Sequence, residues 1–241
     1  MSRTLSLPHE HGGYLTIAGA TAAGVSLAHA RGPSLAIGAV VAAAFFARAP
    51  VEELVRGRGA RFDGIAVAAL AAVVLAASLA LGGIWAAFAL FVASAIVCGS
   101  AFARQGRWHR ATWFETLGMA TLGASAGLVA FAGGVELRVA IAIGIVIAAH
   151  TGLAVPLVRS EVRPRERARA RHAARMALCA LALSAIAVAL VARGRFALAL
   201  VPRTLHALVL TRSSPSPSHP NAVGVRETAM LVLVIVIIVL V

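Results

Sequence analysis

The sequence contains no lysine, one aspartate, one tyrosine and two cysteines among its 241 residues. Charged residues make up 13% of the chain, whereas a soluble domain has about a quarter. This scarcity of charge excludes an ordinary water-soluble domain. Both cysteines, Cys98 and Cys179, fall inside apolar segments and lack metal-ligand spacing, so neither a disulfide nor a cysteine metal site is expected.

What the chain has in abundance is apolar sequence, with 60% hydrophobic residues and a mean hydropathy of +0.90. A helix that crosses a bilayer needs about 20 predominantly apolar residues. Nine segments come close to this requirement: 13–30, 34–49, 64–81, 84–103, 113–133, 138–157, 175–192, 196–211 and 224–241. The predicted fold class is therefore all-α, a polytopic transmembrane bundle of about nine helices in one domain over residues 1–241. Abundant alanine, glycine and serine predict close packing of these helices.

All 22 basic residues are arginine, and most stand between the apolar segments. With the N-terminus on the inner side, 18 arginines fall on inner segments and four on outer ones. Because positive charge is enriched in cytoplasmic loops, this predicts a multi-pass protein of a bacterial-type inner membrane with a cytoplasmic N-terminus. The alternative for the N-terminus is a cleaved signal peptide, because Arg3, an apolar stretch and the small-residue motif AHA resemble one.

The predicted cytoplasmic loops lie at about residues 50–63, 104–112, 159–175 and 212–223. Loop 159–175 contains seven arginines. They either mark topology and attract anionic lipid, or they recognise an anionic headgroup or a diphosphate. Nucleic acid is not an expected partner, because the arginines are not interleaved with aromatic residues. The expected partners are the lipid bilayer and an isoprenoid or anionic lipid.

Three of the nine acids, Glu10, Glu115 and Glu227, stand where odd-numbered predicted spans begin. One interpretation is that each complements the positive end of its helix dipole or pairs with a nearby arginine. The other interpretation is collective. Helix N-termini, carboxylates and arginines at one membrane face would bind a phosphate through a divalent cation, with Mg²⁺ as the candidate cofactor.

The first of these acids lies in the motif PHEHGG, between His9 and His11. Glu10 and His11 form a weak candidate metal site, because a metal needs further ligands from elsewhere in the chain. The alternative is that these histidines are solvated at the headgroup level. His150 lies near the middle of a predicted span, where it should face protein or a cavity and not lipid.

The segment LPHEHGGY is similar to the opening P-x-E-H-G-x-[WY] of the YwiC-like membrane proteins. Three further segments resemble the same family: FETLGMATLGASA, VPLVRSEVR and HPNAVGVRETAML, the last through Pro220, Gly224 and Glu227. The function of that family is uncharacterised, and its nine-helix layout is similar to that of UbiA-type prenyltransferases. The resemblance therefore implies a UbiA-like bundle.

In UbiA-type enzymes, two aspartate-rich motifs on cytoplasmic loops bind Mg²⁺ and a prenyl diphosphate. By position, the resemblance places their counterparts at RAPVEELVRGR and VRSEVRPRE, which contain no aspartate; the chain has only Asp63. Glu52, Glu53 and Glu161 are the acids that could substitute in part. The resemblance thus supports the fold and weakens the activity.

Three functions fit these features. The first is a YwiC-like binding or assembly protein with a polar inner-face cavity for an anionic or diphosphate lipid. The second is a divergent prenyltransferase, in which Mg²⁺ and arginines stabilise the leaving diphosphate. The third is a small-molecule or proton-coupled transporter with His150 and Glu115 as relay groups. No catalytic residue is assigned, and the ligand-binding candidates are Glu10, His11, Arg48, Glu52, Glu115, His150, Arg159 and Glu227.

Overall fold

The computed structural model describes residues 11–28, 32–55, 112–162, 167–192, 194–212 and 220–241, together with the isolated positions 72 and 76. This described part is all-α, as predicted, and contains no β-strand. Its α-helices are α1 (His11–Leu27), α2 (Gly32–Val55), α4 (Thr112–Ala132), α5 (Leu137–Val162), α6 (Arg167–Ala192), α7 (Val201–Arg212) and α8 (Pro220–Leu240), and a 3₁₀ helix, η2 (Arg195–Leu200), precedes α7.

Proline and glycine set several of the helix ends. Pro33, Pro202 and Pro220 each lie in the first turn of a helix, where a missing backbone N–H is not needed for a hydrogen bond. The turn between α4 and α5 passes through Gly134, whose φ of 89° is in the left-handed region that glycine adopts without strain. Gly194, with a φ of 83°, makes the corresponding turn between α6 and η2.

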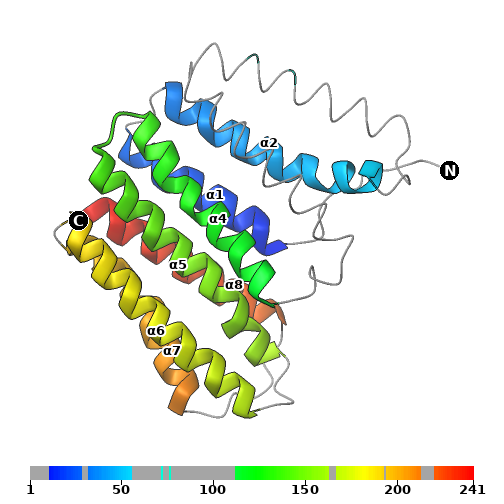
Figure 1. Cartoon of the computed structure of the whole chain (residues 1–241), viewed down its shortest axis with the longest axis vertical. Helices are drawn as coiled ribbons and strands as arrows, with labels where there is room; N and C mark the ends of the chain where they lie inside the picture. Colours follow the sequence, from blue (N-terminus) through cyan, green and yellow to red (C-terminus); the bar gives the residue numbers. More distant parts are fainter. Residues whose placement is uncertain are drawn as a thin grey trace.

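The helices pack side by side with alternating direction (Figure 1). α5 lies between α4 and α6, α1 packs on α4, and α2 covers the outer side of α1 and α4. α7 packs on α6, and α8 contacts α1, α5 and η2. α1, α4, α6 and α8 begin at one end of the bundle, and α2, α5 and α7 finish there. We refer to this end, at which α4 begins and α5 finishes, as the polar end.

Four described helical segments are long and apolar enough to cross a membrane: Thr112–Ala132, Leu137–Val162, Arg171–Ala192 and Asn221–Leu240. They correspond to the predicted spans 113–133, 138–157, 175–192 and 224–241. The described chain therefore has four candidate spans and not the predicted nine. Its length and composition are those of a multi-pass membrane protein.

The structure describes four further predicted spans only in part or almost not at all. Spans 13–30 and 34–49 overlap α1 and α2. The continuous apolar stretches described there with side chains are Thr16–Leu27 and Gly32–Ala43, so both predicted spans lie partly outside the described side chains. Apart from positions 72 and 76, spans 64–81 and 84–103 lie outside the described residues. The count of nine thus stays a prediction for the whole chain.

The predicted span 196–211 is not a single α-helix. It is divided into η2 and the 12-residue helix α7. Pro202 has no N–H to donate, so a regular α-helical ladder is interrupted there. A 3₁₀ helix rises about 2.0 Å and an α-helix about 1.5 Å per residue, so η2 and α7 together are still about 30 Å long.

Helices continue into three of the four predicted loops. α2 extends to Val55 inside loop 50–63, α5 and α6 occupy most of loop 159–175, and α8 begins at Pro220 inside loop 212–223. Arginine and glutamate are good helix formers, so a charged segment can prolong a helix beyond the apolar span. Loop 104–112 lies outside the described residues except for Thr112.

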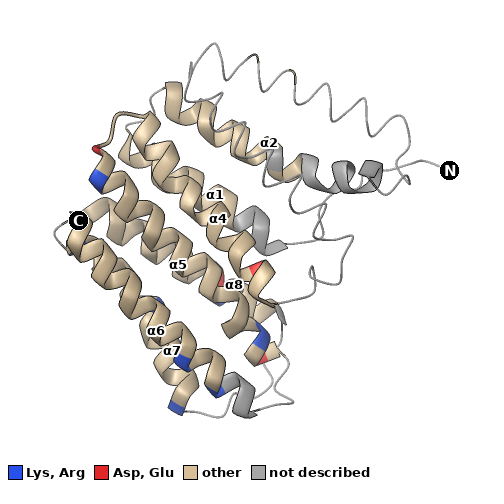
Figure 2. Cartoon of the chain, viewed as in Figure 1, with Lys and Arg blue, Asp and Glu red and all other residues tan. Residues whose placement is uncertain are grey.

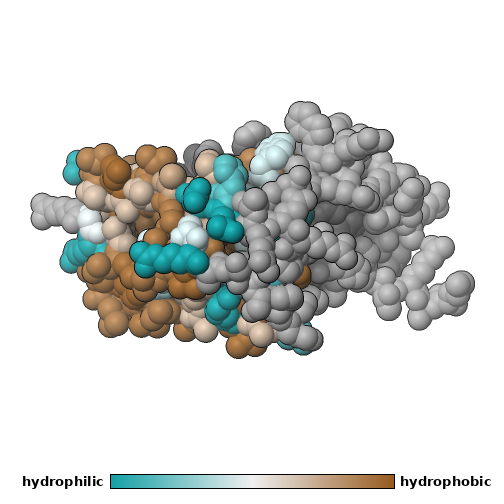
Figure 3. Space-filling model, turned by 90° about the horizontal axis from the view of Figure 1, so that it is seen from below, coloured by the Kyte–Doolittle hydropathy of each residue, from teal (hydrophilic) through white to brown (hydrophobic). Residues whose placement is uncertain are grey.

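The outer surface of α6 is apolar. Met176, Leu183, Ile186 and Leu190 recur at near-helical spacing and are 57% to 82% exposed. Figure 3 shows hydrophobic surface over most of the described atoms on one face of the molecule, with hydrophilic side chains gathered in a few places. A helix that is apolar on its exposed side as well as its buried side suits hydrocarbon, so these stripes are the expected lipid-facing surface.

Small residues bring α4 and α5 into close contact, as the composition predicted. Gly123 and Gly127 form a G-x-x-x-G pattern on α4. A β-carbon on Gly127 would collide with the carbonyl oxygen of Ala140 and would lie 3.1 Å from Cα of Gly144 on α5. The backbones can therefore approach closely. This packing fixes α5, which carries His150, Arg159 and Glu161.

Candidate functional site

Charged residues gather at the polar end of the bundle (Figure 2). Glu115 on α4, Arg159 and Glu161 on α5 and Glu227 on α8 belong to helices that begin or finish there. Glu136, in the turn between α4 and α5, lies at the opposite end. The N-termini of α1, α4, α6 and α8 also lie at the polar end, so their partial positive charges add to those of the arginines.

Glu115 and Arg159 join the start of α4 to the last turns of α5. Arg159 Nη2 donates a hydrogen bond of 2.5 Å to Glu115 Oε1, and Nη1 donates one of 2.8 Å to Thr112 Oγ1. The side chains of Arg159 and Glu115 are 37% and 39% exposed. An ion pair with this exposure stabilises a fold by about 0–1 kcal/mol, so its guanidinium is free to exchange partners.

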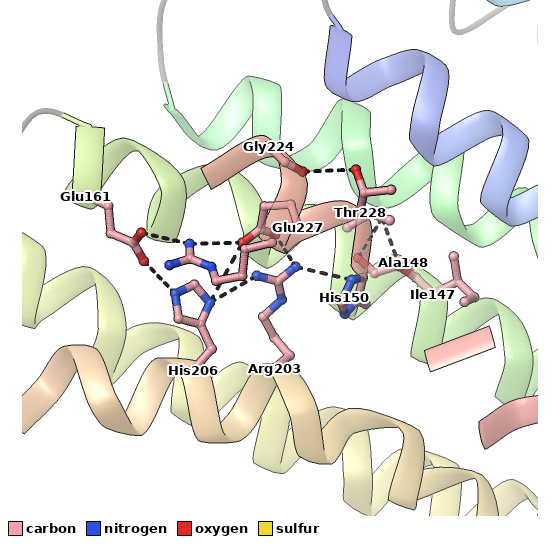
Figure 4. A network of polar contacts seen from close by, with 11 residues as sticks. Ile147, Ala148, His150, Glu161, Arg203, His206, Gly224, Glu227 and Thr228 are labelled. Carbon is pink, nitrogen blue, oxygen red and sulfur yellow. Dashed lines mark hydrogen bonds and ion pairs between the residues drawn. The ribbon is translucent and has the colours of Figure 1, made fainter. Parts of the chain in front are cut away.

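A second group of charges is buried between α5, α7 and α8 (Figure 4). Arg203 on α7 is fully buried, and its Nη2 donates a hydrogen bond of 2.6 Å to Glu227 Oε2 on α8. The same nitrogen lies 3.2 Å from His150 Nε2 on α5, while Nη1 lies 3.3 Å from His206 Nδ1. Arg203 therefore joins three helices. We refer to these four residues with Glu161 and Arg226 as the Arg203 network.

Glu161 contacts the two residues of the Arg203 network that lie nearer the polar end, His206 and Arg226. His206 Nε2 lies 2.5 Å from Glu161 Oε1, and Arg226 Nη2 lies 2.7 Å from Glu161 Oε2 in an ion pair without hydrogen-bond alignment. Arg226 also donates to Glu227 Oε1 at 3.3 Å. The Glu161 side chain is buried, whereas that of Arg226 is 39% exposed. The network thus runs from the surface of the polar end into the bundle.

Hydrogen-bond partners assign the proton positions in the Arg203 network. A guanidinium has only donors, so the histidine nitrogens that face Arg203 accept. His206 Nε2 donates to Glu161, and His206 Nδ1, which faces Arg203, also lies 3.9 Å from Glu227 Oε1. The positive charges of Arg203 and Arg226 are balanced by Glu161 and Glu227. This balance leaves no unpaired charge in the apolar surroundings.

Helix periodicity explains why these residues meet. His150 and Glu161 are eleven residues apart on α5, which is about three turns, so they share one face. Arg203 and His206 are three residues apart on α7 and are also neighbours on one face. Glu227 lies about two turns into α8. At this height it faces both the α5 face that carries His150 and Glu161 and the α7 face that carries Arg203 and His206.

The structure places four of the predicted site residues in two different contact groups. Glu115 contacts Arg159, as the arginine-pairing interpretation expects. His150 and Glu227 both contact Arg203, so His150 faces protein, one of the two environments expected for it. Whether any of these residues binds a ligand stays a prediction.

The other four candidates have no described side chain. Glu10 lies outside the described residues, His11 begins α1, and Arg48 and Glu52 lie within α2. Among the side chains that are described, no group of three or more histidine, cysteine, aspartate or glutamate residues could hold a metal ion. The metal hypothesis for Glu10 and His11 falls outside that part of the chain.

Sequence reasoning missed the centre of this site. The arginine count treats Arg203 as part of an inner segment, whereas the structure places it within α7, buried inside the bundle. The inner excess without it is still 17 to four. The available signal was an arginine within an apolar span, three residues before His206, since intramembrane charges are rare and usually functional. Arg226 had no comparable signal, because it stands at a helix entrance among other arginines.

Comparison with known proteins adds no assignment to this geometry. No protein-family model, no curated protein and no solved structure matches the chain. The resemblance to YwiC-like proteins and to the UbiA layout therefore stays a prediction from the motifs quoted above. What can support a functional proposal is the arrangement of charges at the polar end.

Proposed function

We propose that the chain is an integral membrane protein of the YwiC-like type, with a UbiA-like bundle of about nine spans, that binds the anionic or diphosphate headgroup of a lipid at its polar end. The observation that carries this proposal is the gathering of two half-exposed arginines, Arg159 and Arg226, each paired with a glutamate, at one end of a mostly apolar bundle, with the buried pair of Arg203 and Glu227 beneath them. The predicted orientation, with a cytoplasmic N-terminus in a bacterial-type inner membrane, would place this end in the cytoplasm.

Two of the three arginines are positioned to meet a ligand. The side chains of Arg159 and Arg226 are 37% and 39% exposed, whereas Arg203 is buried. The planar fork of arginine suits the oxygens of a phosphate group. Helix N-termini at the same end favour an anion further. An anionic headgroup would therefore share these guanidiniums with the glutamates that hold them.

The same arrangement supports a second candidate function, a divergent prenyltransferase. Because the three arginine–glutamate pairs balance in charge, a diphosphate would bring negative charge that Mg²⁺ could offset by bridging it to a carboxylate. Glu115, at 39% exposure, is the glutamate of these pairs most open to such an ion. Arg159 beside it would stabilise the charge of a leaving diphosphate.

The transporter hypothesis has less support. Its relay residues, Glu115 and His150, belong to different contact groups. Arg203 stands between His206 and His150 and contacts both. A guanidinium stays protonated in a protein, so a proton could not pass from one histidine to the other through it.

The test is thermal stabilisation of the full chain in lipid nanodiscs by farnesyl diphosphate, farnesol and inorganic diphosphate, each with and without Mg²⁺. We expect farnesyl diphosphate to raise the Tm more than farnesol or inorganic diphosphate, because it engages both apolar surface and guanidinium groups. Arg159→Gln should reduce this shift, while changing the stability of the ligand-free protein by less than about 1 kcal/mol. The matched control is Arg138→Gln, at an exposed position of the opposite end, which should leave the shift unchanged.

Three outcomes separate the candidates. Equal stabilisation by farnesol and farnesyl diphosphate would contradict headgroup recognition. A shift that needs Mg²⁺, accompanied by transfer of the farnesyl group to water or an added acceptor and release of inorganic diphosphate, would favour the transferase. A shift without Mg²⁺ and without release would favour the binding protein.

A further inference from the structure

His150 and Arg203 meet about halfway through the bundle. His150 lies near the middle of the 26-residue helix α5, about 13 Å along the helix axis from Arg159 at 1.5 Å per residue. Arg203 reaches the same depth from the opposite end, because η2 carries the chain inward before α7 begins. The contact between them is therefore remote from Arg159, whereas the half-exposed Arg226 is joined to it through Glu227, which bonds both arginines.

One ring nitrogen of His150 is bonded and the other is not. Arg203 Nη2 lies 3.2 Å from His150 Nε2 and can only donate, so Nε2 accepts and the ring proton is on Nδ1. His150 Nδ1 is buried and has no hydrogen-bond partner among the described residues. Nε of Arg203 is a second buried donor without a partner there.

Unpartnered donors of this kind are rare, because buried polar groups in folded proteins are nearly always hydrogen-bonded. His150 is only 2% exposed, so bulk solvent does not satisfy it. The carbonyls of its own helix do not accept from Nδ1 either. Because the hydrogen bond to Arg203 fixes the orientation of the ring, Nδ1–H points in one direction and is preorganised to donate to an acceptor.

We infer that His150 Nδ1–H is the binding group of a buried site, at mid-depth in the bundle, for a small uncharged oxygen acceptor. Glu227 already neutralises Arg203 at 2.6 Å, so an anion bound here would bring a second, unpaired negative charge. A carbonyl oxygen of a lipid-soluble molecule and a bound water share the required chemistry, since each offers lone pairs without charge. This site lies deeper than the two half-exposed arginines of the polar end and takes an uncharged ligand, and its test does not require a headgroup to bind.

NMR of the unmodified protein tests which ring nitrogen of His150 carries the proton. His150 is the only one of the eight histidines followed by threonine, so labelling histidine carbonyl carbon and threonine nitrogen identifies its resonances by NMR in nanodiscs. We expect the His150 ring to be neutral, with the proton on Nδ1 and a ¹⁵N shift typical of a hydrogen-bonded N–H. A proton on Nε2, or a doubly protonated ring, would overturn the inference.

Two compounds distinguish a lipid-soluble acceptor from a bound water. They are 2-undecanone, which has a carbonyl near one end of an apolar chain, and undecane, which has none. If the acceptor is lipid-soluble, the ketone shifts the His150 Nδ1 resonance and raises the Tm, and the alkane does neither. If the acceptor is water, water protons give a cross-peak to Nδ1–H and the ketone has no effect. A resonance that responds to neither water nor ketone would also overturn the inference.

Two variants extend the ketone experiment. His150→Asn keeps an amide near the position of Nδ1, and His150→Gln keeps an amide near Nε2, where it still meets Arg203. For a lipid-soluble acceptor, Asn retains part of the ketone-dependent stabilisation and Gln loses it. The control His172→Gln, at an exposed position of α6, keeps the full response. The NMR result on the parent protein decides the inference if either His150 variant fails to fold.

Discussion

At the scale of single residues, Arg203 is the group on which the buried polar site depends. It is 0% exposed and contacts Glu227, His150 and His206 from three helices. Taking two charges out of water is expensive, and the attraction between them repays this only when the geometry is good. The pair of Arg203 and Glu227 is thus weak evidence of net stabilisation, but breaking it leaves one charge buried without its partner.

We predict that Arg203→Met destabilises the protein by about 3–5 kcal/mol, because Glu227 then loses its closest buried partner. The double variant Arg203→Met/Glu227→Gln should recover part of this loss, since no unpaired carboxylate is left. Reversible unfolding in detergent, followed by circular dichroism, measures the four free energies of the cycle. The control Arg138→Met, at an exposed position, should change stability by less than about 0.5 kcal/mol.

Equal effects of Arg203→Met and Arg138→Met would show that Arg203 is not paired in a dry site. A double variant as unstable as the sum of the two single variants would show that Arg203 and Glu227 do not interact.

The exposed pair behaves differently at the same scale. Arg159 and Glu115 are each more than a third exposed, so water and salt weaken their attraction. Stability therefore depends little on this pair, whereas ligand binding at the polar end can depend on it strongly. Arg159 is for this reason the better residue for testing function, and Arg203 the better residue for testing the fold.

At the scale of helices, the hairpin of α4 and α5 is the best-defined packing unit. The close approach at Gly127 and Gly144 places backbone against backbone. In lipid, such contact replaces the hydrophobic effect as the source of helix association. The hairpin holds Glu115 and Arg159 at one end and the Gly134 turn at the other.

We predict that Gly127→Ala destabilises the hairpin by about 1–3 kcal/mol, because the added methyl group overpacks the contact with Ala140. Gly118→Ala on the same helix is the matched control, since a β-carbon there meets nothing within 4 Å. It should be neutral or stabilising by up to about 1 kcal/mol. Thermal unfolding of both variants in the same detergent gives the comparison, and equal Tm values would contradict the observed packing.

The change from η2 to α7 is the second feature at this scale. A 3₁₀ segment has poorer hydrogen-bond geometry than an α-helix and is often found at functional positions. Here it ends at Leu200, three residues before Arg203. The irregular backbone therefore lies beside the buried network and helps to set the direction in which Arg203 enters it.

At the scale of the whole molecule, the alternating helices separate a polar end from an opposite end with few charges. Glu136 lies in the turn between α4 and α5, and Arg171 lies near the beginning of α6. Since α5 runs between these two positions, they are at opposite ends of the bundle. Which end faces the cytoplasm is predicted by the arginine excess alone.

We predict that single cysteines at these positions label from opposite sides of the membrane. In a Cys98→Ser/Cys179→Ser background, Glu136→Cys should react with a membrane-impermeant maleimide in intact cells. Arg171→Cys should react only after the cells are permeabilised. The reason is that segments rich in arginine stay on the cytoplasmic side during insertion.

The reverse pattern would overturn the predicted orientation and the cytoplasmic placement of the polar end. Labelling of both cysteines from the same side would show that α5 does not cross the membrane, and would remove the membrane assignment itself.

The sequence by itself determined the helical class, the four apolar spans that the described chain contains, and the gathering of charge at one end. These features follow from local chemistry, because a run of apolar residues and the position of a charge can be read without knowing any partner. The sequence also favoured an arginine as the partner of Glu115, but that the partner is Arg159, 44 residues away, came from the structure.

Only the tertiary structure decided which buried groups meet. Arg203 pairs with Glu227 across 24 residues, and His206 pairs with Glu161 across 45. Partner choice at these separations depends on the rotation and axial position of each helix, which are set by packing over the whole bundle and not by any local pattern. The position of Arg203 also decides which ring nitrogen of His150 is bonded and which has no partner among the described residues, and no motif around His150 could have predicted this.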